Sequence, residues 1–120
     1  MPATIVVVHD DPTFVDRTVT ALRAAGHTVM SFADPMAALA ALEAVEHLEL
    51  LLTRVQFPPG QPNGVALARM VRFKLPRTKV LFVALPERQE HTEGVGELLA
   101  TPVTAAEILA AVDRLLARDG

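Results

Sequence analysis

The 120-residue sequence lacks cysteine, tryptophan and tyrosine, and it has only five phenylalanines. Without cysteine there is no disulfide, no thiolate nucleophile and no cysteine-bound zinc. The scarcity of aromatic rings argues against a stacking platform for single-stranded nucleic acid. The formal net charge of −3 provides no basic field for nucleic acid or for an anionic membrane.

Long apolar runs are also missing. No stretch approaches the ~20 residues that a membrane-spanning helix needs. Residues 1–4 include no basic segment followed by an apolar run, so we expect no signal peptide. Apolar residues nevertheless make up 51% of the chain, which is enough for a hydrophobic core. We therefore expect a cytoplasmic protein with a single domain over residues 1–120.

What the sequence does contain is a regular alternation of short apolar runs and amphipathic segments. The apolar runs are typical of strands that are buried on both faces. The predicted strands are Thr4–Val8, His27–Phe32, Leu48–Thr53, Val80–Ala84 and Leu98–Ala100.

Apolar residues at helical spacing predict helices between these strands. Asp34, and Thr104 together with Glu107, are typical residues at helix starts, and Gly26 is a typical helix end. The residues at helical spacing in the first helix are Phe14, Val15, Thr18, Val19, Leu22 and Ala25. The apolar face of the second helix is formed by Met36, Leu39 and Leu42, and the third helix carries Leu67, Met70 and Val71. The last helix is expected to present Ile108, Val112, Leu115 and Leu116 inward.

The alternation predicts an α/β fold in which helices cover both faces of a doubly wound, five-stranded parallel sheet. Functional residues in such sheets lie at the carboxyl ends of the strands, where the strand order reverses. The candidates at these ends are His9–Asp11, Arg54, Leu85–Pro86 and Thr101–Pro102.

These strand ends resemble those of response regulator receiver domains, which have a flavodoxin-like fold. Val6–Pro12 resembles the family's valine run, acidic pair and proline. Leu50–Arg54, followed by Pro58, resembles the strand that delivers the phosphoaccepting aspartate, and Gly96–Pro102 resembles the last strand. The resemblance covers the whole chain and implies a role in two-component phosphorelay signalling.

The resemblance also implies that the phosphotransfer site is degenerate. Arg54 occupies the phosphoacceptor position, and a guanidinium group cannot attack phosphorus. His9 replaces the first acidic residue, and Ala84 replaces the residue with a hydroxyl. Thr101 stands in place of the lysine, and Leu98 in place of the aromatic switch residue.

Two acidic residues remain, and their roles stay open. Asp10 is a weak candidate ligand for Mg²⁺, but Arg54 would repel the ion, so we expect no cofactor and weak or absent Mg²⁺ binding. Arg54 either pairs with Asp10 or Asp11 or extends into solvent. Asp11 either belongs to the site or starts the first helix. His9 and Asp10 together form an acid–base dyad, a pair of metal ligands or no functional unit.

The segment between Ala84 and Leu98 has almost no apolar face. We therefore expect the fourth helix to be a turn or two long, or absent. In receiver domains this helix belongs to the usual output face, so its loss would affect both switching and dimerisation.

The resulting prediction is a non-enzymatic pseudo-receiver that binds a protein partner in a signalling pathway. It is expected to be a monomer or a weak homodimer that binds neither nucleic acid nor membrane, and no DNA-binding output domain is expected. One alternative is a receiver phosphorylated at Asp10 or Asp11. Another is a flavodoxin-like domain for a small ligand, although residues 9–14 lack the glycine of a phosphate cradle.

Overall fold

The computed structural model describes residues 2–118, so both ends of the expected 1–120 domain lie outside the described residues. Strands and short helices alternate along the chain, as the sequence predicts. In chain order the elements are β1 (Thr4–Val8), α1 (Pro12–Ala24), β2 (Thr28–Phe32), α2 (Pro35–Leu42), β3 (Leu50–Thr53), α3 (Gly64–Lys74), β4 (Lys79–Ala84), η1 (Pro86–Arg88), α4 (Gln89–Thr92), β5 (Glu97–Ala100) and α5 (Ala105–Leu116).

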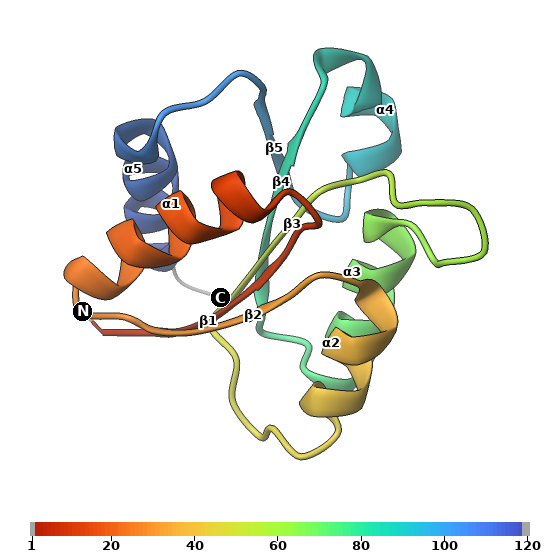
Figure 1. Cartoon of the computed structure of the whole chain (residues 1–120). Coiled ribbons are helices and arrows are strands. Elements are labelled where there is room, and N and C mark those ends of the chain that lie inside the picture. Colours follow the sequence, from red (N-terminus) through yellow and green to blue (C-terminus); the bar gives the residue numbers. More distant parts are fainter. Residues whose placement is uncertain (1, 119–120) are drawn as a thin grey trace.

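The strands form one five-stranded sheet in the order β2-β1-β3-β4-β5 (Figure 1). All four strand pairs are parallel, which confirms the predicted doubly wound sheet. The order reverses at β1, which lies between β2 and β3. Val8 pairs there with Thr53, so the residues that follow β1 and β3 leave the sheet side by side. This reversal positions the candidate site.

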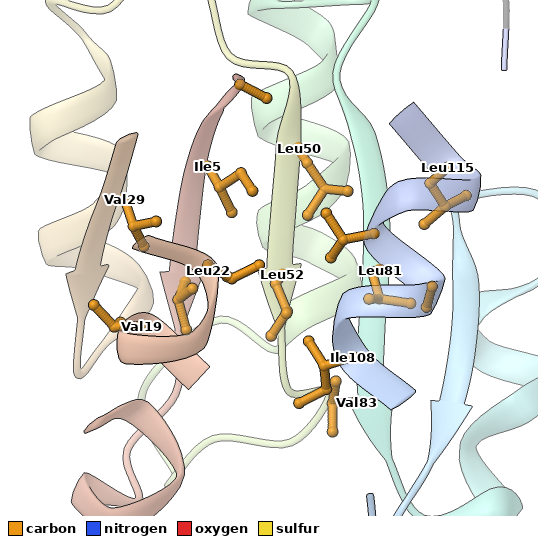
Figure 2. Close-up of a cluster of buried hydrophobic side chains, with 14 of the residues drawn as sticks. Ile5, Val19, Leu22, Val29, Leu50, Leu52, Leu81, Val83, Ile108 and Leu115 are labelled. Atoms are coloured by element: carbon orange, nitrogen blue, oxygen red, sulfur yellow. The ribbon is translucent and has the colours of Figure 1, made fainter. Parts of the chain in front are cut away.

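Helices α1 and α5 cover one face of the sheet, and α2, α3 and α4 lie on the other (Figure 1). Alternate residues of each strand point to opposite faces. Ile5 packs with Leu22 of α1 and Ile108 of α5 in the first core cluster (Figure 2), whereas Val6 belongs to the second cluster, with Leu67 of α3. Burial on both faces explains why Ile5–Val8 of β1 and Leu50–Leu52 of β3 are apolar without interruption.

Capping side chains start the helices where the sequence predicts. Asp34 accepts a hydrogen bond from the backbone N–H of Ala37 at 2.8 Å. Thr104 and Glu107 form the predicted reciprocal capping box at the start of α5. Gly26, at φ +95°, follows α1 in the left-handed region that favours glycine.

The prediction that Met36 belongs to the apolar inner face of the second helix is wrong, because 57% of its surface is exposed, and Met70 of α3 is 43% exposed. In α3 the buried stripe runs through Leu67 and Val71, one turn apart. Each residue turns the helix by about 100°, so Met70 lies at the edge of that stripe. In α2 the buried Ala38 and Leu42 define the inner face, and Met36 lies off it.

The prediction of a shortened fourth helix is confirmed. The segment between β4 and β5 holds only the 3₁₀ turn η1 and the four-residue α4, and Thr92 is the buried residue of α4. Within residues 2–118, every helix is too short or too polar to span a membrane.

Candidate functional site

The carboxyl ends of β1, β3, β4 and β5 surround a hollow of about 310 Å³ at one edge of the sheet. Its lining combines strand ends with the loop before α3 and the turn η1. The lining residues are His9, Arg54, Val55, Gln56, Val83, Ala84, Leu85, Arg88 and Thr101. The predicted site residues His9, Arg54, Ala84 and Thr101 are therefore brought together.

Arg54 follows β3 directly, and its Nη1 donates a hydrogen bond to Oδ1 of Asp10. Asp10 is one of the two partners that the sequence left open. The side chains are 36% and 31% exposed, so this is an ion pair at the mouth of the site, of a kind that contributes about 0–1 kcal/mol to stability. The guanidinium carbon also lies 6.0 Å from the centroid of the Phe57 ring.

The Arg54 contact lowers the pKa of the Asp10 carboxyl. Partial desolvation alone would raise the pKa of the Asp10 carboxyl. The hydrogen bond and positive charge of Arg54 outweigh that effect, and the net pKa lies below its ordinary value. Asp10 is therefore held as a carboxylate whose Oδ1 is engaged by a cation.

Asp11 serves the helix rather than the hollow. Its Oδ1 accepts a hydrogen bond from the backbone N–H of Thr13 at 3.0 Å, which makes it the N-cap of α1. Of the two roles that the sequence left open for Asp11, the structure shows the helix start.

His9 lies against α1, with its ring stacked on Phe14 at a centroid distance of 4.2 Å. Its Nδ1 accepts a hydrogen bond from the backbone N–H of Asp11 at 3.0 Å. Burial lowers the pKa of His9, and the positive charge of Arg54 lowers it further. The negative charges of Asp10 and Asp11 raise the pKa, but they do not outweigh these two effects. The neutral ring therefore carries its proton on Nε2.

His9 and Asp10 do not form a hydrogen-bonded dyad. Nδ1 of His9 and Oδ1 of Asp10 are 3.9 Å apart, which is too long for a hydrogen bond. Each group is instead held by another partner, His9 by the Asp11 N–H and Asp10 by Arg54.

The residues at the ends of β4 and β5 complete the hollow. The backbone N–H of Thr101 donates to the carbonyl of Ala84 at 2.9 Å, which brings the Thr101 side chain to the lining. The Thr101–Pro102 peptide bond is cis. Leu98, at the predicted switch position, is partly buried against the second core cluster.

Sequence reasoning missed three residues of this region. Gly64 lies so close to β3 that a Cβ atom there would be 1.8 Å from the carbonyl oxygen of Arg54. Arg88 and Gln56 line the hollow and bond to each other, with the guanidinium group donating to Oε1 of Gln56. The Asn63–Gly64 pair is a local signal for the helix start, whereas no local pattern indicates the contact between η1 and the loop.

No protein-family model matches the sequence, and no curated protein matches it. Solved structures do match: the chemotaxis response regulator CheY4 of Vibrio cholerae is 22% identical, with a TM-score of 0.84 over 96% of this chain and 99% of that one. A CheY-like receiver domain protein from Methanospirillum hungatei is 24% identical, with a TM-score of 0.84 over 97% and 94%. A receiver domain protein from Clostridium thermocellum is 21% identical, with a TM-score of 0.82 over 95% and 94%.

The chain has the fold of a response regulator receiver domain. Its sheet order and five-stranded parallel topology agree with this CheY-like, flavodoxin-like architecture. The hollow described above lies at the carboxyl edge of the receiver sheet, where the resemblance places the phosphotransfer chemistry.

The residues present in this receiver fold do not suit the Mg²⁺ ion that the fold family implies. Mg²⁺ prefers oxygen ligands, chiefly carboxylates and water. Oδ1 of Asp10 is engaged by Arg54, Oδ1 of Asp11 caps α1, and His9 supplies nitrogen. Over residues 2–118, no three histidine, aspartate or glutamate side chains cluster as a metal site would need.

Proposed function

We propose that the chain is a pseudo-receiver that works in two-component signal transduction by binding a protein partner and accepts no phosphoryl group. The receiver fold supports the signalling role. The observation that carries the loss of chemistry is the position of Arg54, which directly follows β3 and forms an ion pair with Asp10.

The chemistry of aspartyl phosphorylation explains why this observation matters. Transfer to a carboxylate depends on positioning and on neutralising the charge of the transferred group. Arg54 offers no carboxylate nucleophile and stays protonated. Ala84 has no hydroxyl, and Thr101 has no ammonium group for the phosphoryl oxygens.

The test is phosphorylation of the purified protein with acetyl phosphate and with a phosphorylated histidine kinase, in Mg²⁺ buffer. Intact mass under denaturing conditions detects only a covalent phosphoryl group. We expect no mass increase, while a working receiver treated in parallel gains one phosphoryl group. A phosphorylated product would overturn the proposal, and peptide mapping would show whether Asp10 or Asp11 had accepted it.

Weak or absent Mg²⁺ binding belongs to the same proposal. Saturation of the protein at sub-millimolar Mg²⁺ in isothermal titration calorimetry would contradict it. The competing flavodoxin-like function requires a glycine-rich backbone cradle for phosphate after β1, and the backbone there is committed to the Asp11 cap of α1. A purified protein without flavin absorbance would count against that alternative.

We propose that the partner is another protein of the signalling pathway and that binding takes place in the cytoplasm. The chain is proposed to be a monomer or a weak homodimer. The overall charge of −3 supports a partner other than nucleic acid or an anionic membrane. A pull-down from native cell extract followed by mass spectrometry identifies the partner, and co-purification of nucleic acid as the dominant species would contradict the proposal.

A further inference from the structure

The hollow at the carboxyl edge of the sheet has an unusual balance of charge. Its ionisable lining residues are His9, Arg54 and Arg88, and none of its described lining residues is acidic. Asp10 neutralises part of the charge of Arg54 from outside this lining. The hollow therefore has one nearby paired carboxylate for two guanidinium groups.

Arg54 keeps hydrogen-bonding capacity despite its partner. Its contact with Asp10 uses Nη1, and a guanidinium group carries further N–H donors on its other nitrogens. Because the side chain lies at the mouth of the hollow, a ligand entering there meets these donors without first breaking the ion pair.

Arg88 is the less neutralised of the two cations. It extends from η1 and donates to the neutral Oε1 of Gln56. Glu87 and Glu90 lie close to it in the sequence, but within residues 2–118 it forms no ion pair with a carboxylate. An anion in the hollow would supply the missing negative charge.

Two neutral donors complete the set. The hydroxyl of Thr101 can donate, and the neutral ring of His9 has its proton on Nε2 because Nδ1 accepts from Asp11. Guanidinium groups bind oxyanions of phosphate type through paired N–H bonds, and hydroxyl groups add single bonds.

We propose that this hollow reversibly binds a phosphate-type oxyanion between Arg54 and Arg88, with the Thr101 hydroxyl as a further donor. The binding involves no covalent step, so it is independent of whether the chain accepts a phosphoryl group. A site at this edge that holds a metal cation requires carboxylates, and here the charge is inverted.

The neighbourhood of the hollow leaves room for a ligand larger than the anion alone. A second hollow of about 550 Å³ shares Val55, Gln56 and Arg88 with the first, and its further ionisable lining residues are Arg69, Glu90 and His91. Two sources of the oxyanion therefore have to be distinguished, namely inorganic phosphate and the phosphate group of a small ester.

The experiment is a titration of ¹⁵N-labelled protein with inorganic phosphate or with glycerol 3-phosphate, at ionic strength held constant with chloride. Backbone amides of Val55, Gln56 and Thr101 report binding in two-dimensional NMR spectra. We expect saturable shifts at these amides with a Kd on the order of 1 mM. Tighter binding of the ester would identify it as the better source, and tighter binding of phosphate would identify the free ion.

Variants link the shifts to the hollow. Arg88→Gln should weaken binding about tenfold or more, which corresponds to about 1.4 kcal/mol. Arg88→Lys keeps the charge without the planar fork and should bind with intermediate affinity. Arg77→Gln removes the same charge at a separate hollow beside Leu75 and is the matched control that should leave the affinity unchanged.

The outcomes are distinct because the spectra also report folding. Shifts that stay linear to high concentration for both probes would overturn the proposal, as would equal affinity in wild-type protein and Arg88→Gln. If Arg88→Gln loses its native spectrum, Arg88→Lys decides: affinity equal to the wild type in that variant would overturn the assignment, as would equal weakening of binding in Arg77→Gln.

Discussion

Thr18 of α1 is fully buried, and it holds the one buried side-chain oxygen within residues 2–118 that has no hydrogen-bond partner. A buried hydroxyl without a partner loses its hydrogen bonds to water and regains none. Valine has nearly the same shape without the hydroxyl. Thr18→Val should therefore raise the free energy of unfolding by about 1–2 kcal/mol, measured by urea unfolding monitored by circular dichroism.

Thr18→Ser is the matched control for this prediction. It keeps the hydroxyl and removes the methyl group, so it should be less stable than the wild type. A Thr18→Val variant that is less stable than the parent would show that the hydroxyl has a partner in solution.

His9 gives the protein a pH dependence of predictable sign. Burial lowers its pKa, whereas in the unfolded chain the pKa is about 6.5. As the pH falls through about 6.5, the unfolded chain takes up a proton that the folded protein does not, so the free energy of unfolding decreases. The contribution of neutral His9 to the free energy of unfolding is complete above about pH 6.5. It is lost as the pH falls towards the lower pKa of the folded state.

His9→Gln should flatten this slope in urea unfolding series between about pH 5 and pH 8. His47 is an exposed histidine away from the site, so His47→Gln should retain the slope. An identical slope in wild-type protein and His9→Gln would contradict the assignment. The Asp10 carboxyl also makes the free energy of unfolding decrease as the pH falls, but over a lower pH range. Its stability contribution is present above about pH 3.9 and is lost as the pH falls further.

Arg54→Asp tests how far the site departs from a working receiver. The new carboxylate would lie beside Asp10, and like charges raise at least one pKa and weaken the fold. Without Mg²⁺ we expect the variant to be less stable by roughly 0.5–2 kcal/mol, with part of the loss recovered by Mg²⁺. Phosphorylation should stay slow until His9→Asp, Ala84→Thr and Thr101→Lys are added.

Thermal melts with and without Mg²⁺, together with a phosphodonor assay, measure both effects of Arg54→Asp. Arg54→Gln is the neutral control, which removes the cation without adding a carboxylate and should show no Mg²⁺ effect. Fast Mg²⁺-dependent phosphorylation of the single variant Arg54→Asp would mean that Arg54 alone prevents the reaction.

Among the secondary-structure elements, the start of α3 has the tightest steric constraint on the site. The Gly64 backbone N–H donates to the carbonyl of Val55 at 2.6 Å, and a Cβ atom would overlap the Arg54 carbonyl. Gly64→Ala must push the helix away from β3, at a cost of about 1–3 kcal/mol. We also expect shifted NMR signals for Arg54 and Val55.

Gly60→Ala is the comparison for this prediction. Gly60 has φ +91° and open space around its Cα, so its substitution strains only the loop. In Gly60→Ala, only the NMR signals of residues close to position 60 should change. Unchanged Arg54 and Val55 signals in Gly64→Ala would show that the close contact is not rigid.

At the scale of the whole molecule, stability should be uneven across the fold. The central strands are completely buried, as Leu51 and Leu52 of β3 show, whereas η1 and α4 contain few buried residues. Amides of β1 and β3 should exchange with solvent only on global unfolding, and amides of residues 87–92 much faster. Hydrogen exchange followed by NMR checks this, and equal protection in both regions would contradict it.

The sheet and its strand ends were predictable because buried parallel strands need unbroken apolar runs, such as residues 50–52 of β3. The caps at Asp34 and Thr104 were predictable because they are local. The sequence limited the possible acidic partners of Arg54 to Asp10 and Asp11. It could not distinguish between them, because the two residues are adjacent. Arg88 was beyond prediction because its place depends on how η1 packs against a distant loop, which no local pattern encodes.

The contact between Gly64 and the end of β3 also has a consequence for chain length. Because Gly64 is hydrogen-bonded to Val55, the loop over residues 56–63 begins and ends at nearly the same point. Doubling the length of such a closed loop costs only about 0.6 kcal/mol of chain entropy. The loop can therefore gain residues without displacing Arg54, which makes it a natural place to insert an affinity tag or a fluorescent reporter in a protein that has no tryptophan of its own.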